Sequence, residues 1–249
     1  MAREFRFSKK TVSSIGEAIA DSRMITRGDR ITVGLSGGKD SVLLAAALAG
    51  LRKKSPVPFT VDACMIDITG GKIDTAPIKA LCEGLGIDLE IIARPILDII
   101  ASRNEPSPCS FCSNMRGGIL FKGAAEKGST TVAMGHNLDD AVETAMLNLF
   151  FAGRFDSFAP RSWRSRSGLW LIRPLVYIPE KDIENEVRRL DLPTISPMCP
   201  FPKESRRERM KKLVGLLEKE IPDIRAQVLH ALKGSPRWQE FSPKKTQIH

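Results

Sequence analysis

One short segment of this chain, residues 36–41, constrains its fold more than any other. An apolar run at 31–35 predicts a buried strand directly before it, and a helix is predicted to begin at Asp40 and continue through 42–48. Glycine lets the backbone approach an anion closely, and the first N–H groups and positive dipole end of a helix attract one. The segment therefore predicts a phosphate-binding turn between a strand and a helix.

The segment contains the donors that such a turn needs. It reads Ser36-Gly37-Gly38-Lys39-Asp40-Ser41. The two serine hydroxyls can donate to phosphate oxygens, and Lys39 adds a cation. It is not a Walker A loop, because that pattern spaces its first glycine farther from the Gly-Lys pair and has Ser or Thr after the lysine. The alternative is a glycine turn that caps a helix and binds nothing.

Strand and helix patterns alternate through the first part of the chain. Further strands are predicted at 59–66, 89–93 and 130–134, and helices at 76–85, 116–127 and 139–151. This alternation predicts an α/β fold, with a doubly wound, mostly parallel sheet covered by helices on both faces. Ligands of such sheets bind beyond the carboxyl ends of the strands, where the phosphate-binding turn is expected.

The sequence predicts additions at both ends of this core domain, which spans residues 30–175. Residues 1–29 form an N-terminal addition with a helix around 12–21. Prolines become frequent after residue 173. Residues 176–249 are predicted to form a helical C-terminal extension that packs on the sheet, with helices at 181–190, 207–219 and 224–232.

Length and hydropathy limit the class of protein. The chain of 249 residues is long enough for one sizeable α/β domain with additions. Its first residues contain no apolar signal segment, and the longest apolar stretch, 42–51, is too short to span a bilayer. We therefore expect a cytoplasmic protein without a membrane partner.

A formal net charge of +9 predicts a polyanionic partner. The basic residues form three clusters: Arg161, Arg164 and Arg166 around Trp163; Lys203, Arg206, Arg207, Arg209, Lys211 and Lys212; and Lys233, Arg237, Lys244 and Lys245. Such clusters attract a phosphate backbone without sequence specificity. A solvated basic surface without a partner is the alternative.

Five cysteines, an odd number without a secretion signal, argue against a disulfide framework. Cys109 and Cys112 form a CxxC pair in a predicted loop, and Cys199 follows much later, before a proline. Thiols in this pattern hold a soft metal, form a redox disulfide or relay a persulfide, although three do not complete a four-thiolate site. Cys64 and Cys82, in a predicted strand and helix, are expected to be core residues.

A second polar turn follows the strand predicted at 130–134. It reads Gly135-His136-Asn137-Leu138-Asp139-Asp140. It should lie at the same sheet edge as the phosphate-binding turn, where two carboxylates, together with Asp40, can hold Mg²⁺ on a triphosphate. The alternative is a pair of acids and a capping asparagine that serve only the following helix. His136 is either a nucleotide contact or a loop residue.

These motifs, in this order, resemble the PP-loop ATP-pyrophosphatase family and, within it, the tRNA thiolase group. The resemblance covers about residues 30–225 and includes the Cys-Pro at 199 with the basic helix after it. It implies an adenine nucleotide alpha-hydrolase-like fold, with 30–175 as the ATP-binding domain, and a tRNA that faces the basic C-terminal extension. Members thiolate a cytidine or a uridine, and these residues leave the base open.

The resemblance also implies a reaction. Such enzymes cleave ATP between its α- and β-phosphates, adenylate a pyrimidine of tRNA, and replace its C2 oxygen with sulfur from a donor such as a cysteine desulfurase or sulfide. In this group three cysteines hold a [4Fe–4S] cluster, and they match Cys109, Cys112 and Cys199. Asp139 matches the acid that assists chemistry on the base, and Arg116 matches a basic position that orients sulfide or a phosphate.

ATP and Mg²⁺ are the other expected cofactors, and a homodimer is compatible with the resemblance. The residues expected to bind nucleotide are Leu35, Ser36, Gly37, Gly38, Lys39, Asp40, Ser41, Ile66, Gly135, His136 and Asp140. Three alternatives remain: a persulfide relay between Cys112 and Cys199, a PP-loop ligase in which the cysteines form a structural metal clip, and a non-catalytic iron–sulfur RNA-binding protein. The intact phosphate-binding turn argues against the last, since a pure binder does not need it.

Overall fold

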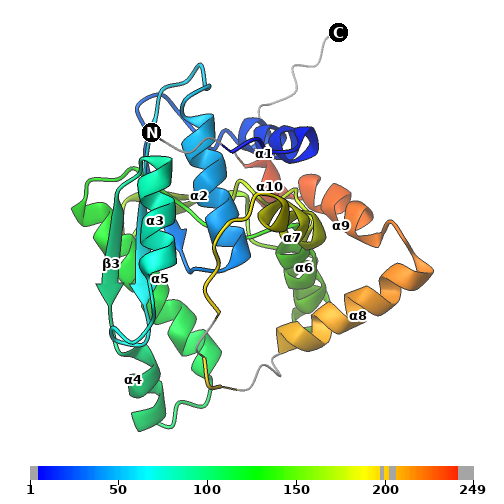
Figure 1. The fold of residues 1–249 in the computed structure, drawn as a ribbon. Helices are drawn as coiled ribbons and strands as arrows, with labels where there is room; N and C mark the ends of the chain where they lie inside the picture. Colours follow the sequence, from blue (N-terminus) through cyan, green and yellow to red (C-terminus); the bar gives the residue numbers. More distant parts are fainter. Residues whose placement is uncertain (1–4, 197–198, 202–205, 241–249) are drawn as a thin grey trace.

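A six-stranded sheet forms the centre of the molecule, with helices on both faces (Figure 1). The computed structural model describes residues 5–196, 199–201 and 206–240. The strand order is β3-β2-β1-β4-β6-β5, and all neighbours are parallel except β5 and β6. The strands are β1 (Arg30–Leu35), β2 (Thr60–Asp67), β3 (Leu89–Ala93), β4 (Thr131–Ala133), β5 (Arg161–Arg164) and β6 (Leu169–Ile172). The predicted doubly wound, mostly parallel α/β fold is confirmed.

The helices cover both faces of the sheet, and the first and last elements of the described chain are helices. They are α1 (Lys9–Asp21), α2 (Lys39–Leu51), α3 (Ala76–Leu85), α4 (Ile96–Ser102), α5 (Pro108–Glu126), α6 (Leu138–Ala152), α7 (Glu180–Arg189), α8 (Arg206–Glu220), α9 (Ile224–Lys233) and α10 (Pro236–Gln239). Helix α2 packs on β1 and α7 at one face, and α5 packs on β2 and β4 at the other. Within the described ranges, none of these helices has the length and apolar character of a membrane span.

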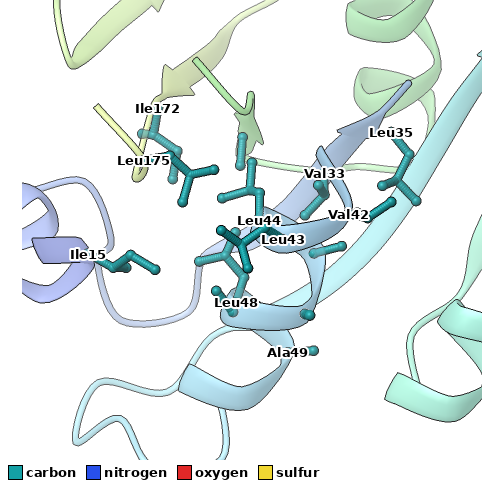
Figure 2. Close-up of a cluster of buried hydrophobic side chains, with 14 of the residues drawn as sticks. Ile15, Val33, Leu35, Val42, Leu43, Leu44, Leu48, Ala49, Ile172 and Leu175 are labelled. Carbon is teal, nitrogen blue, oxygen red and sulfur yellow. The ribbon is translucent and has the colours of Figure 1, made fainter. Parts of the chain in front are cut away.

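Helix α2 is apolar on all sides, and every residue from 41 to 49 is buried. Its side chains Leu43, Leu44 and Leu48 lie in one core with Ile172 and Leu175 (Figure 2). Because full burial of one leucine side chain contributes about 1.5–3 kcal/mol, α2 is held firmly against the sheet. The core therefore fixes the position of the turn that precedes α2.

Helix α5 begins at Pro108, well before the predicted start at 116. The prediction that Cys109 and Cys112 lie in a loop was therefore wrong, because both lie in the first turns of α5. Pro108 is in the first turn of the helix, where a missing N–H costs little and the proline φ is already helical. The missed part, residues 108–115, contains proline, serines, cysteines and an asparagine, which do not show a clear helical pattern.

Four elements have no counterpart among the predictions: α4, β5, β6 and α10. Strand β5 is a polar edge strand, Arg-Ser-Trp-Arg, and therefore lacks the apolar run of a central strand. The first and last helices join the main core, since Ile15 of α1 and Trp238 of α10 belong to the same cluster as α2.

Candidate active site

The phosphate-binding turn is held by its own serines. The Ser36 backbone N–H donates to Ser41 Oγ (3.1 Å), and the Ser41 hydroxyl donates to the Gly38 carbonyl (2.9 Å). Gly37 has a φ of +80°, which glycine adopts without strain. Gly38 is the N-cap of α2 and supplies no side-chain acceptor. The N-terminus of α2 is therefore left for an anionic ligand.

The second polar turn lies directly against the first. A Cβ on Gly135 would lie 3.0 Å from the carbonyl carbon of Asp40 and 3.1 Å from the Ser41 nitrogen, so only glycine permits this approach. Asn137 then joins the two turns, because its Nδ2 donates to Asp40 Oδ1 at 3.0 Å. The prediction that both turns meet at one edge of the sheet is confirmed.

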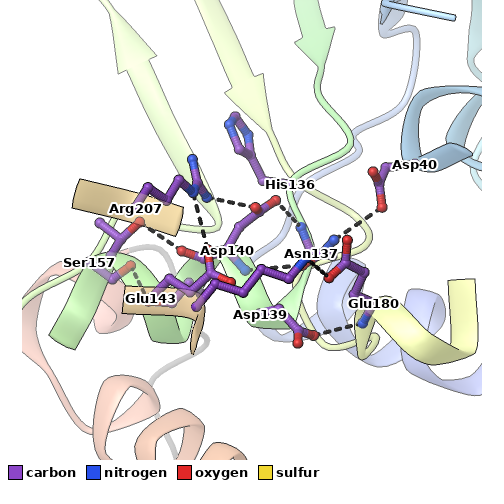
Figure 3. Close-up of polar contacts among 12 residues, drawn as sticks. Asp40, His136, Asn137, Asp139, Asp140, Glu143, Ser157, Glu180 and Arg207 are labelled. Atoms are coloured by element: carbon purple, nitrogen blue, oxygen red, sulfur yellow. Dashed lines mark hydrogen bonds and ion pairs between the residues drawn. The ribbon is translucent and has the colours of Figure 1, made fainter. Parts of the chain in front are cut away.

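Asn137 also holds a second carboxylate at this edge (Figure 3). The Asn137 backbone N–H donates to Asp140 Oδ2, and the Asp140 backbone N–H donates to Asn137 Oδ1, each at 3.0 Å. These two bonds cap the N-terminus of α6. Burial raises the pKa of Asp140, and the charges of Asp40 and Glu180 raise it too, whereas Arg207 lowers it. A site where carboxylates repel one another gains stability from a divalent cation.

Lys39 is paired with carboxylates on two sides. Its Nζ lies 2.7 Å from Glu180 Oε1 and 3.3 Å from Asp40 Oδ2. Burial lowers the pKa of Lys39, but the two carboxylates together outweigh burial and raise it, so the amine is a cation. The other Glu180 oxygen binds Lys211 Nζ of α8 at 2.6 Å. Glu180 thus links the turn to α8, and a phosphate at the turn would compete with it for Lys39.

Helix α8 closes the site from the C-terminal extension. Arg207 binds Asp140 Oδ1 at 2.6 Å and Glu143 Oε2 at 3.2 Å. On the same helix, Met210 and Val214 are buried against the apolar side of α6. Arg207, which was predicted to face a polyanion, therefore neutralises carboxylates of the site itself.

Asp139, which the resemblance places in catalysis, has structural partners. Its Oδ2 accepts from the Glu180 backbone N–H at 2.6 Å, and its Oδ1 pairs with Arg225 of α9 at 2.7 Å. Figure 3 shows the carboxylate directed at the Glu180 nitrogen. These contacts support a positioning role, and the catalytic role of Asp139 stays a prediction.

His136 is neutral and engaged with Arg173. Its Nδ1 accepts from Arg173 Nε at 3.2 Å, and its ring centroid lies 5.0 Å from that of Phe158. Burial, aided by the charge of Arg173, lowers the pKa of His136 to about 3. Of the two roles considered for His136, the structure favours the loop residue over the nucleotide contact.

The CxxC pair projects past the strand ends. A Cβ on Gly34 of β1 would lie 2.8 Å from Leu120 Cδ2, so α5 packs closely on the sheet at that level. Cys112 precedes Leu120 by two turns of helix, about 12 Å at the α-helical rise. Because the N-terminal part of α5 points toward the carboxyl ends of the strands, Cys112 lies beyond the edge that carries the phosphate-binding turn.

The three predicted cysteine ligands lie within electrostatic reach of one another. Burial raises the pKa of the Cys112 thiol, as do the charges of Cys199 and Cys109, whereas Arg116 lowers it and hydrogen-bonds to the thiol. Cys109 and Cys199 are exposed. A cation beside a thiol favours the thiolate that binds metal or carries sulfur. In the described part of the chain, no three His, Cys, Asp or Glu side chains are gathered closely enough to hold a metal ion.

A backbone hydrogen bond ties the Cys199 segment to the phosphate-binding turn. The Ile195 N–H donates to the Gly37 carbonyl at 2.8 Å, and a Cβ on Gly37 would lie 3.0 Å from Ile195 Cβ. Cys199 comes four residues after Ile195 in the sequence, a length of chain that spans at most about 14 Å. The hydrogen bond at Ile195 therefore limits how far Cys199 can lie from the phosphate-binding turn.

Other predicted residues lie where the sequence places them. Leu35 and Ile66 are at the carboxyl ends of β1 and β2. Cys64 and Cys82 are each 1% exposed, which confirms them as core residues. In the third basic cluster, Lys233 pairs with Glu17 and Asp21, and Arg237 pairs with Asp156. The predicted cluster members Lys203, Lys244 and Lys245 lie outside the described residues.

Sequence reasoning missed Glu180 and Ile195. An acid after a proline at the start of a helix is common, so Glu180 carries no signal of its bond to Lys39. Ile195 acts through its backbone N–H, which any residue except proline supplies.

Comparison with known proteins places this geometry in a family. The chain matches the model of the PP-loop domain over residues 8–196. A tRNA-cytidine(32) 2-sulfurtransferase of Geobacter sulfurreducens is 38% identical over 230 residues, which cover 90% of this chain and 89% of the relative. The enzyme of that name from Geobacter metallireducens is 36% identical over 228 residues, with the same coverage of 90% and 89%.

A solved structure agrees. The U34-tRNA thiolase NcsA from Methanococcus maripaludis, with its [4Fe–4S] cluster, superposes with a TM-score of 0.72 at 26% identity, over 91% of this chain and 77% of that one. The resemblance inferred from the motifs is confirmed. The chain therefore belongs to the PP-loop family and, within it, to the family of the tRNA-cytidine(32) 2-sulfurtransferases.

Proposed function

We propose that this protein is an ATP-dependent tRNA sulfurtransferase that converts cytidine at position 32 to 2-thiocytidine. The observation that carries the proposal is the hydrogen bond from the Ile195 N–H to the Gly37 carbonyl, because it joins the phosphate-binding turn to the Cys199 segment. The named activity of the relatives, which cover 90% of the chain, supports cytidine over uridine as the base.

Activation of the base takes place at the two turns. The phosphates of ATP bind the N-terminus of α2 and the serine hydroxyls, and Lys39 exchanges Glu180 for a phosphate oxygen. The cytosine O2 attacks the α-phosphorus, the bond to the α–β bridging oxygen breaks, and pyrophosphate leaves. The Lys39 cation stabilises the charge that develops on the phosphates. The resulting O2-adenylate is a good leaving group.

Asp40 and Asp140 are the carboxylates that fit Mg²⁺. Both are held by Asn137, and the charge of Asp40 raises the pKa of Asp140. Carboxylate oxygens are the protein ligands that Mg²⁺ prefers, alongside water and substrate phosphates.

Cys109, Cys112 and Cys199 are the donors that we propose for a [4Fe–4S] cluster with three protein ligands; their chemistry suits it, and the three thiols must draw closer together than in the described structure to hold it. The donor set is three free thiols, and Arg116 favours the thiolate at Cys112. Bound there, the cluster would supply an iron without a protein ligand, at which sulfur from sulfide or a cysteine desulfurase can be held. In the transfer step a sulfur nucleophile adds to C2, the C2–O2 bond breaks, and O2 leaves with AMP.

We also propose that the protein is located in the cytoplasm and that it forms a homodimer. Two exposed thiols support the first, since exposed free cysteines persist in a reducing compartment.

The test is thiolation of an unmodified tRNA by anaerobically prepared protein with ATP, Mg²⁺ and sulfide, read by nucleoside mass spectrometry. Cys112→Ala is expected to abolish 2-thiocytidine and keep ATP binding. Cys82→Ala, which removes a buried thiol of α3, is the matched control and is expected to keep both. Thiolation by Cys112→Ala would contradict the three-cysteine site. Pyrophosphate release by the wild type with a product other than a thionucleoside would favour the PP-loop ligase.

A further inference from the structure

A group of large apolar side chains is exposed at the end of α6 and in the loop after it. Leu149, Phe150, Phe151 and Phe155 are 40%, 55%, 60% and 39% exposed. Single exposed apolar residues are common, but neighbouring phenylalanines with this much exposure mark a surface that is covered in a complex. We call these four residues the α6 tip.

Arginines border the α6 tip. The guanidinium carbon of Arg206, the first residue of α8, lies 5.0 Å from the centre of the Phe151 ring. Arg154 belongs to the loop itself, and Arg209 follows Arg206 on α8, at the spacing of neighbours on one helix face. Among the residues that the structure describes, no carboxylate forms an ion pair with Arg154, Arg206 or Arg209. The surface is therefore both aromatic and cationic.

The start of α8 links the α6 tip to the proposed active site. Arg207, the neighbour of Arg206, bonds to Asp140 and Glu143 of α6. Cys199 is seven residues before Arg206 in the chain. Figure 1 shows the start of α8 beside one end of α6, across from the N-terminal end of α5 that carries Cys112.

The positive charge around the α6 tip favours RNA over a second copy of the chain as its binding partner. A second copy of the chain would bring arginines against arginines across a two-fold axis, which is unfavourable. RNA supplies phosphates for the arginines and flat bases for the rings, and stacking on aromatic and guanidinium groups is how proteins hold unpaired bases. A target base that leaves its stack also leaves its neighbours without a partner.

We propose that Phe150, Phe151 and Arg206 form a stacking platform for an unpaired base of the tRNA loop, next to the nucleotide that is modified. This inference rests on the proposed function and names the surface by which that site receives its RNA. The base stacks on the surface formed by Phe150, Phe151 and Arg206, while Arg154 and Arg209 contact the adjoining phosphates.

The test compares aromatic and aliphatic side chains at one position. Dissociation constants for an unmodified tRNA are measured at one salt concentration for Phe151→Ala, Phe151→Leu and Phe151→Trp. We expect Phe151→Ala and Phe151→Leu to weaken binding about 5- to 150-fold, the range for loss of one stacked base, and Phe151→Trp to bind like the wild type. Leu216→Ala removes a side chain of α8 that is 58% exposed, and serves as the matched control with unchanged affinity.

A second readout follows the base itself. With 2-aminopurine in the loop beside the target position, stacking is expected to quench its fluorescence with wild type and Phe151→Trp, and not with Phe151→Leu. Wild-type affinity in Phe151→Leu would overturn the platform. A second result would also overturn it: a molecular mass of Phe151→Ala below that of the wild type by light scattering, with unchanged tRNA affinity. The α6 tip would then be a dimer interface. If the wild type itself fails to bind tRNA, it is the proposed function that fails.

Discussion

Gly135→Ala tests whether the close approach of the two turns matters for nucleotide binding. The new Cβ would lie 3.0 Å from the Asp40 carbonyl carbon, 3.1 Å from the Asp40 oxygen and 3.1 Å from the Ser41 nitrogen. Carbon atoms in good contact are about 3.5–4.0 Å apart, so the turns must separate by about 0.5 Å. All three neighbours are backbone atoms at the start of α2, which the core holds in place.

Overpacking of this kind costs about 1–3 kcal/mol. For a chain of this size, this cost lowers the melting temperature by roughly 2–12 °C. If separation of the turns instead relieves the strain, the same energy is lost from ATP affinity, about 5- to 150-fold. The assay is a melting curve with and without ATP and Mg²⁺, together with titration calorimetry of α,β-methylene-ATP.

Gly16→Ala is the matched control, because Gly16 lies in α1 and no atom lies within 4 Å of its added Cβ. Replacing a glycine inside a helix is expected to stabilise it by about 0.5–1 kcal/mol. A Gly135→Ala protein with the melting temperature and the nucleotide affinity of the wild type would refute the argument that backbone contact at Gly135 holds the two turns in register.

Three further predictions follow from the polar contacts. Glu180→Gln removes the carboxylate that competes with phosphate for Lys39. Calorimetry should therefore show nucleotide binding about 2- to 5-fold tighter, the range expected for a partly exposed ion pair. Weaker binding would mean that the Glu180 carboxylate contributes to nucleotide affinity. Asp139→Asn and Arg225→Gln break the same ion pair; a positioning role predicts equal losses of thiolation, whereas a catalytic Asp139 predicts a far larger loss in Asp139→Asn. His136 is neutral in the fold, with a pKa of about 3, and gains a proton on unfolding below pH 6.5. The free energy of unfolding should therefore fall as pH falls from about 6.5 toward 3, by at most ~1.4 kcal/mol per pH unit. Denaturant titrations of His136→Gln should show a shallower fall of this free energy with pH, and the same fall as in the wild type would contradict the assignment.

The fold could be predicted because its signals are local and repeated. Continuous apolar runs predicted β1 and the start of α2 to within one residue, although α2 continues three residues beyond its predicted end. The glycine- and serine-rich turn between them is typical of a phosphate-binding turn. Strand β5 could not be found this way, since an edge strand with two arginines looks like a loop. The start of α5 was predicted too late for a related reason, because residues 108–115 contain only two large apolar side chains among proline, serines, cysteines and an asparagine.

The site could be predicted only in its motif residues. The two turns and the cysteines follow patterns of residue types, and the parallel sheet brings such patterns to one edge. Glu180 and Ile195 have no pattern, since their contacts to Lys39 and Gly37 join segments far apart in the sequence. For His136 the sequence left two roles open, nucleotide contact or loop residue, because the residue type alone does not reveal its contacts with Arg173 and Phe158.

The measurement that tests the central claim most directly is nucleoside mass spectrometry of position 32 after one reaction. Anaerobically reconstituted protein, with iron and acid-labile sulfide assayed beforehand, is incubated with unmodified tRNA, ATP, Mg²⁺ and sulfide. The account predicts 2-thiocytidine at position 32, with one AMP and one pyrophosphate formed for each thiolated base. Protein that contains iron and sulfide and releases pyrophosphate, but leaves this cytidine unchanged, would contradict it.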